Sequence, residues 1–153
     1  MTHRIYFRKT DSKLHFYRRE ENATRKLGEL AIEWDDLIRR FFVHDIPTEG
    51  EIEHAINYLE DTIMSRMDMV SREPQPLFTD DPELIALLNP QGLEVREYDR
   101  DAVEEMFSRY ALLSMGRSPA YEKVTMDARK YAALLVIREI LHHMNFTGIH
   151  LIR

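Results

Sequence analysis

The sequence predicts an α+β fold, in which a small, mainly antiparallel sheet packs against four to five helices. The predicted sheet consists of an N-terminal hairpin, a middle strand and a C-terminal strand. Three observations lead to this prediction: alternating runs at both ends of the chain, longer runs between them with apolar residues every three or four positions, and 44% hydrophobic residues in a chain of 153. This length suits one core, so we expect a single α+β domain over residues 1–153.

Two alternating runs at the start of the chain predict a β-hairpin. Ile5 and Phe7 share one face of the first run, and Leu14 and Phe16 share one face of the second. Residues 9–12 favour a turn, because Asp and Ser side chains hydrogen bond to their own backbone. The opposite face then carries basic and aromatic side chains, namely Arg4, Tyr6, Arg8, His15, Tyr17 and Arg19.

Helical spacing covers most of the middle of the chain. The clearest helix start is a capping box, in which Thr48 and Glu51 each satisfy the other's backbone N–H. Asp81 followed by Pro82 is typical of another start. The predicted helices span residues 23–43, 48 to about 70, a short segment after 81, 99 to about 115, a segment from 118, and 127–144.

Two further strands are predicted in the second half of the chain. Residues 93–98 alternate, and residues 148–152 have the composition of a closing strand. We expect the last strand to pair with the N-terminal hairpin and so hold both ends of the chain. Residues 71–76 contain two prolines and are predicted to be an extended connection.

Composition excludes several chemistries. The chain has no cysteine, which excludes disulfides, thiolate nucleophiles and cysteine-bound metals. No run approaches the roughly 18 apolar residues of a membrane span, and the first residues lack the apolar stretch of a signal peptide. We therefore expect a cytoplasmic protein with no membrane partner. The net charge of −6 is uneven, because residues 44–98 carry three Lys or Arg and thirteen Asp or Glu.

The sequence lacks the motifs of nucleotide binding and of nucleophilic catalysis. Its five glycines are too scattered to form a phosphate loop. Ser114, Ser118 and Thr125 lack the Gly-x-Ser-x-Gly context of a hydrolase nucleophile. We therefore predict no cofactor.

Two Glu-x-x-His pairs carry the side chains that di-iron helical bundles use. The pairs are Glu51 with His54 and Glu139 with His142. On a helical projection both pairs point away from the apolar stripe of their helix, and Glu51 already belongs to the capping box. The projection therefore favours two solvated pairs over a metal site.

His44 and Asp45 form a dipeptide that resembles the one found in metal-dependent phosphohydrolases of the HD class. In a plainer interpretation, Asp45 stabilises a turn before Pro47, and His44 meets the carbonyl end of the preceding helix. One alternative function is therefore a metal-dependent or histidine-based hydrolase. Its residues would be His44, Asp45, His54 and His142.

The basic and aromatic face of the hairpin suggests a second alternative function. Arg4, Tyr6 and Tyr17 supply the charge and the rings that bind single-stranded nucleic acid on sheet surfaces. Basic residues also protect exposed strands from aggregation, and a net negative charge opposes binding to a polyanion. Nucleic acid is therefore the less favoured partner.

A cationic segment before and within the last long helix predicts a binding surface. Arg117, Tyr121, Lys123 and Arg129 suit a small anionic ligand or the acidic surface of a protein partner. The helix over residues 127–144 is apolar on more than one side, which is typical of a central helix or of a homodimer interface.

These patterns include no nucleophile, phosphate loop or metal cluster. The sequence therefore favours a non-enzymatic interaction module that binds a protein partner or a second copy of itself. The hydrolase and the nucleic-acid binder remain as alternatives.

Overall fold

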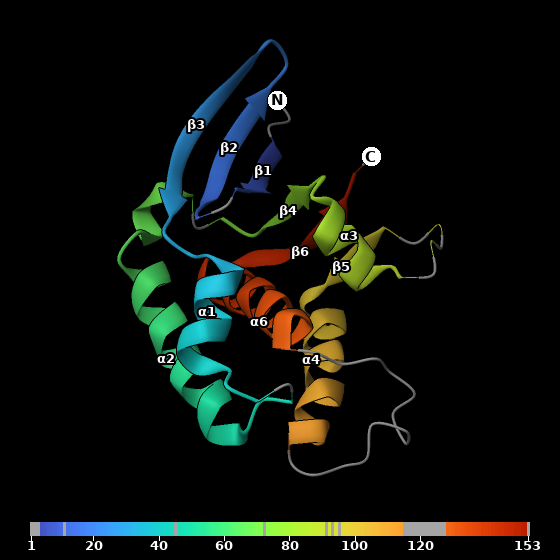
Figure 1. The fold of residues 1–153 in the computed structure, drawn as a ribbon. Helices are drawn as coiled ribbons and strands as arrows, with labels where there is room; N and C mark the ends of the chain where they lie inside the picture. The colour runs from blue at the N-terminus through green and yellow to red at the C-terminus, as the bar shows by residue number, and fades with distance from the viewer. Residues whose placement is uncertain are drawn as a thin grey trace.

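A computed structural model describes residues 4–152, except for residues 11, 45, 72, 91, 93, 95 and 115–127. It confirms the α+β fold: a six-stranded sheet, in the order β3-β2-β1-β4-β6-β5, packs against five α-helices in the described part of the chain (Figure 1). The sheet is mixed, because β1 pairs with β4 and β4 pairs with β6 in parallel. The expectation of a mainly antiparallel sheet is corrected to this extent.

The predicted N-terminal hairpin is confirmed. It consists of β1 (Arg4–Lys9) and β2 (Leu14–Glu20), which pair antiparallel. Phe7 lies opposite Phe16 on the buried face, and Tyr6 lies opposite Tyr17 on the other face, which we call the outer face. The two-residue period of the strands therefore separates the core from a basic and aromatic surface.

Residues 23–30 form a strand, β3 (Ala23–Leu30), where the sequence predicted the start of a long helix. Leu27, Leu30 and Trp34 have helical spacing, but Leu27 and Leu30 belong to a strand that pairs antiparallel with β2. Pairing with β2 therefore overrides the helical pattern. Gly28 of this strand also lies against Met69 with no room for a Cβ, since that atom would be 2.4 Å from the Met69 Sδ.

Two helices follow β3. Helix α1 (Trp34–Phe41) is shorter than predicted, and α2 (Glu49–Met64) begins with the predicted capping box, both hydrogen bonds of which are present. A short 3₁₀ helix, η1 (Met67–Met69), replaces the predicted final turns of the second helix. Ile52 and Leu59, two of the predicted core residues of α2, are buried.

The proline-containing segment includes a strand that the sequence did not reveal. This strand, β4 (Gln75–Thr79), lies between β1 and β6, so the predicted pairing of the last strand with the hairpin is wrong. Leu77, Phe78 and Thr79 are all buried, as is typical of a central parallel strand. The register shifts at Pro76, which has no N–H to donate to the ladder.

The second half of the chain largely follows the prediction. Asp81 caps α3, Asp99 accepts a hydrogen bond from the Ala102 N–H at the start of α4, and the closing strand is confirmed. The predicted end of a helix at Gly116 and the start near Ser118 lie outside the described residues. The elements are α3 (Pro82–Leu88), β5 (Glu97–Asp99), α4 (Arg100–Ser114), α6 (Ala128–His143) and β6 (Phe146–Leu151).

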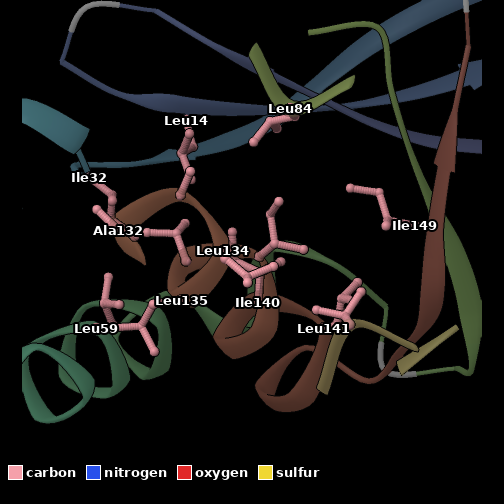
Figure 2. Close-up of a cluster of buried hydrophobic side chains, with 14 of the residues drawn as sticks. Leu14, Ile32, Leu59, Leu84, Ala132, Leu134, Leu135, Ile140, Leu141 and Ile149 are labelled. Carbon is pink, nitrogen blue, oxygen red and sulfur yellow. The ribbon is translucent and has the colours of Figure 1, made fainter. Parts of the chain in front are cut away.

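Helix α6 is the centre of the molecule. It contacts α1, α2, α3, α4 and β6, and it lies among the other helices in Figure 1. Eleven of its sixteen residues are buried. Figure 2 shows Leu135 of α6 beside Leu59 of α2, and Ala132 near Ile32. The prediction of a helix that is apolar on more than one side is therefore explained by packing within the chain.

None of the helices in the described part of the chain combines the length and the apolar character that crossing a bilayer requires.

Candidate functional site

The carboxyl ends of β1 and β4 define the position of the site. From β1 the sheet continues to β2 and β3 on one side, and to β4 and β6 on the other. In open sheets with parallel strands, ligands bind where the strand order reverses in this way, outside the carboxyl ends of the strands. In this chain that point lies between Lys9, the last residue of β1, and Thr79, the last residue of β4.

Thr79 joins the ends of these two strands. Its hydroxyl donates a hydrogen bond to the Phe7 carbonyl oxygen at 3.0 Å and accepts one from the Asp81 N–H at 3.2 Å. The side chain is fully buried, so both hydrogen bonds are shielded from water. Thr79 therefore fixes the start of α3 relative to β1.

A crevice of about 230 Å³ opens at this edge of the sheet. Lys9 and Arg129 are its cations, and both contact Glu83. Arg129 also donates a hydrogen bond of 2.5 Å to Asp35. The residues that line the crevice are Lys9, Thr10, Glu33, Trp34, Asp35, Asp81 and Arg129.

Glu83 and Arg129 shift each other's pKa in the directions that favour their charged forms. Burial raises the pKa of Glu83, but hydrogen bonds from Arg129 and Lys9 outweigh this effect and lower the pKa overall. A hydrogen bond to Glu83 raises the pKa of Arg129, against the effect of burial. Glu83 therefore remains ionised at neutral pH and holds both cations at the crevice.

Two polar groups in the crevice have no partner among the described residues. The Trp34 side chain is buried, and its indole Nε1–H, a donor, has no acceptor. The Glu33 carboxylate, at the N-cap position of α1, makes no hydrogen bond to that helix and no ion pair with another described side chain. By contrast, Asp81 accepts a hydrogen bond from the Leu84 N–H at 3.1 Å. The crevice thus offers a donor and a carboxylate that nothing in the described part of the chain pairs with, beside two cations.

Of the predicted cationic segment, the structure places Arg129 in this crevice. Arg117, Tyr121 and Lys123 lie outside the described residues. Lys9, Glu33 and Glu83 were not predicted as site residues. They are separated from Arg129 by dozens of positions in the sequence, and only the topology of the sheet brings them together.

Arg4, Tyr6 and Tyr17 lie together on the outer face of the sheet, away from the buried face that carries Phe7. The Arg4 guanidinium is 4.8 Å from the centroid of the Phe78 ring, and the rings of Tyr6 and Phe78 are 5.5 Å apart. These contacts pair rings and cations within the sheet.

The described residues of the predicted hydrolase alternative belong to no cluster of three or more potential metal ligands. His44 has a side chain that is 66% exposed and lies 3.0 Å from the Glu51 carboxylate, while His54 and His142 are also exposed. Asp45 lies outside the described residues. Glu51 is committed to the capping box and to the Val43 N–H, so the pair of Glu51 and His54 is not a metal site.

Glu139 differs from its prediction, because it is buried and not directed to solvent. The reason is that α6 is enclosed on several sides, with α2 and α4 against it. Its histidine partner is His143, one helical turn further on, at 3.1 Å. The sequence carries this signal as a Glu-x-x-x-His spacing on one helix face.

Comparison with known proteins identifies the fold. No protein-family model and no curated protein matches the chain. Among solved structures, it is similar to the Ppx-GppA enzyme of Aquifex aeolicus, with a TM-score of 0.68 and 14% identity over 98% of this chain and 53% of that one. It is also similar to an exopolyphosphatase from Cytophaga hutchinsonii, with a TM-score of 0.63 and 15% identity over 96% and 52%.

A further structure, also of a Ppx/GppA family member from Aquifex aeolicus, has a TM-score of 0.70 at 16% identity over 97% of this chain and 52% of that one. The chain therefore spans about half the length of these proteins. The finding overturns the interpretation as a non-enzymatic interaction module and, with it, protein binding as the function, because the solved structures that share the fold are phosphatase-family enzymes.

Proposed function

We propose that this chain forms a phosphate-binding domain of a phosphatase that hydrolyses phosphoanhydride bonds, with inorganic polyphosphate as the substrate class. The proposal belongs to the hydrolase alternative, although its residues differ from those that the sequence suggested. The observation that carries it is the position of Lys9 and Arg129 beside the reversal of strand order. The names of the structurally similar enzymes support the choice of substrate.

The electrostatics of the crevice suit an oxyanion. Arginine offers a planar fork of donors that matches two phosphoryl oxygens, and lysine adds a point charge. The Nε1–H of Trp34 is a further donor, which has no acceptor among the described residues. A bound phosphoryl group would share these donors with Glu83 and Asp35, which hold the guanidinium of Arg129 in place.

The reaction requires a water molecule to attack the terminal phosphorus. A new P–O bond forms to the water oxygen as the bridging P–O bond breaks, and the water proton passes to a base. We assign this role to Glu33, whose carboxylate lines the crevice without a hydrogen bond to α1. Lys9 and Arg129 stabilise the charge on the phosphoryl oxygens in the transition state.

The test measures binding and hydrolysis separately. Tripolyphosphate should raise the unfolding temperature of the chain, and Lys9→Met or Arg129→Gln should weaken its affinity by about ten- to a hundredfold. Glu33→Gln should retain tripolyphosphate affinity and lower the rate of phosphate release from polyphosphate by about 10²- to 10⁴-fold. Calorimetry and a phosphate-release assay measure the two quantities.

Arg109→Gln is the matched control, because Arg109 is an exposed arginine of α4 that contacts Glu105. It should leave both binding and hydrolysis unchanged. Equal affinity in the Lys9 and Arg129 variants, or equal phosphate release in Glu33→Gln, would show that the crevice is not the site.

A further inference from the structure

A second cluster of polar side chains lies far from the crevice, where α2 packs against α6. It contains Glu60 of α2 with Glu139 and His143 of α6, each of which offers one ligand atom, and these atoms all lie within 4.8 Å of one another. In the described part of the chain, no other set of three or more potential ligands lies this close together. Glu139 is ten residues from Arg129, so about 15 Å of helix separates the cluster from the crevice.

Two distances within the cluster match those between ligands of one metal ion. His143 Nε2 lies 3.1 Å from a Glu139 oxygen and 3.5 Å from a Glu60 oxygen. Ligands at about 2.0–2.2 Å from a cation are separated by roughly 3.0–3.5 Å in tetrahedral or octahedral geometry. The oxygens of Glu60 and Glu139 lie within 4.8 Å of each other, so the partly exposed side chain of Glu60 would have to adjust to bind the same cation.

His143 Nε2 is the unusual atom of the cluster. It is shielded from solvent and makes no hydrogen bond of acceptable geometry, although two carboxylates face it. A lone pair directed at carboxylate oxygens is repelled unless a proton or a cation lies between them. A metal ion bound between these three side chains would supply that positive charge.

The surroundings of Glu139 support the same conclusion. Its side chain is 4% exposed and faces the Glu60 carboxylate and the His143 imidazole. Arg138 Nη1 lies 3.4 Å from Oε1 of Glu139, which leaves Oε2 toward His143. Arg138 also pairs with Glu104 at 2.6 Å. Glu139 is therefore oriented by Arg138 and still has one oxygen available.

We propose that Glu60, Glu139 and His143 bind one divalent transition-metal ion of the zinc class, which joins α2 to α6. One imidazole and two carboxylates suit Zn²⁺ or Mn²⁺, whereas Mg²⁺ and Ca²⁺ prefer sites built from oxygen alone. A cavity of about 580 Å³ adjoins the site, lined in part by Glu60, Glu139 and His142, and supplies room for water to complete the coordination. The ion acts as a clamp between helices and does not depend on the proposed phosphatase activity.

The experiment uses the full chain after removal of metal with EDTA and dialysis. Zn²⁺ should bind with a stoichiometry of one and raise the unfolding temperature, and Mg²⁺ at the same concentration should not. Co²⁺ should give visible d–d absorption bands that report its coordination. His143→Gln and Glu60→Gln should each weaken Zn²⁺ binding at least about tenfold.

Glu60 has a side chain that is 39% exposed, so Glu60→Gln should fold as the wild type does. His142→Gln is the matched control, because His142 is the exposed neighbour of His143 and lines the same cavity. It should leave Zn²⁺ affinity unchanged. The proposal is overturned if Zn²⁺ does not stabilise the chain, if Mg²⁺ binds equally well, or if His142→Gln reduces the affinity while Glu60→Gln does not.

Discussion

Glu139 is an ionisable residue whose burial lowers the stability of the folded chain. It is a carboxylate on the most buried of the described helices, with Arg138 as its neighbouring cation and His143 and Glu60 facing it. Taking a charge out of water costs free energy unless the charge is well paired. The raised pKa of Glu139 indicates that its pairing only partly offsets its burial.

The resulting prediction concerns stability and pH in the metal-free protein. Because the pKa of Glu139 is higher in the folded than in the unfolded chain, its contribution to stability is present below about pH 4.5 and is lost as the pH rises through the folded value. We expect wild type to lose stability relative to Glu139→Gln over the range that begins near pH 4.5 and ends at the raised folded pKa, by about 1.4 kcal/mol for each unit of pKa shift. Urea denaturation in EDTA measures both proteins. A constant difference across this range would contradict the prediction.

At the residue scale, local signals could be predicted from the sequence and long-range ones could not. The capping box of Thr48 and Glu51 and the cap at Asp81 are local motifs, and both are present. The contact between Lys9 and Glu83 joins β1 to α3 across 74 positions. The residues around Lys9 and those around Glu83 contain no motif that predicts this contact, because the contact depends on the order of the strands in the sheet.

At the scale of elements, the sequence did not predict the strands β3 and β4, and the reasons for these two errors differ. In β3 the spacing of Leu27 and Leu30 imitates a helix, and the helical interpretation ignored the pairing that β2 offers. In β4 the run after Pro76 is short and buried at every position, so its sequence does not alternate between apolar and polar residues. Strands that are stabilised by their neighbours carry a weak signal of their own.

A glycine determines whether the edge strand β5 pairs with β6. Gly148 lies opposite Asp99, and a Cβ at this position would be 2.4 Å from the Tyr98 carbonyl oxygen. Gly148→Ala should therefore separate β5 from β6 and destabilise the chain by about 1–3 kcal/mol. Chemical denaturation measures the change. Thr147→Ala, at an exposed position of the same strand, should have a much smaller effect, and similar losses in the two variants would contradict the steric explanation.

At the scale of the whole molecule, α6 joins the other described helices to the sheet. It contacts four other helices and β6, and its residues form a large part of the core. This central role was predictable as one of two outcomes, because an apolar helix is either central or part of an interface. The order of the strands in the sheet could not be predicted, because β4, which lies between β1 and β6, was not recognised in the sequence.

A substitution in the middle of α6 should affect the entire fold. Leu135 is fully buried and lies beside Leu59 of α2 in Figure 2. Leu135→Ala should lower the free energy of unfolding by about 2–5 kcal/mol, because it removes buried apolar contacts and leaves a cavity. Far-UV and tryptophan signals should report one shared transition in urea. Met64→Ala, where the side chain is 59% exposed, is the control and should change stability little.

The two ends of the sheet constrain how another chain can associate with this one. At one end, β3 carries the exposed Arg25 and Lys26, and hydrogen bonds from Lys13 and Lys26 lower the pKa of Glu29 to about 2. At the other end, β5 is only three residues long. Fixed charges and short length both discourage the addition of a strand. These features therefore favour association with a second polypeptide through a face of the molecule over extension of either border of the sheet.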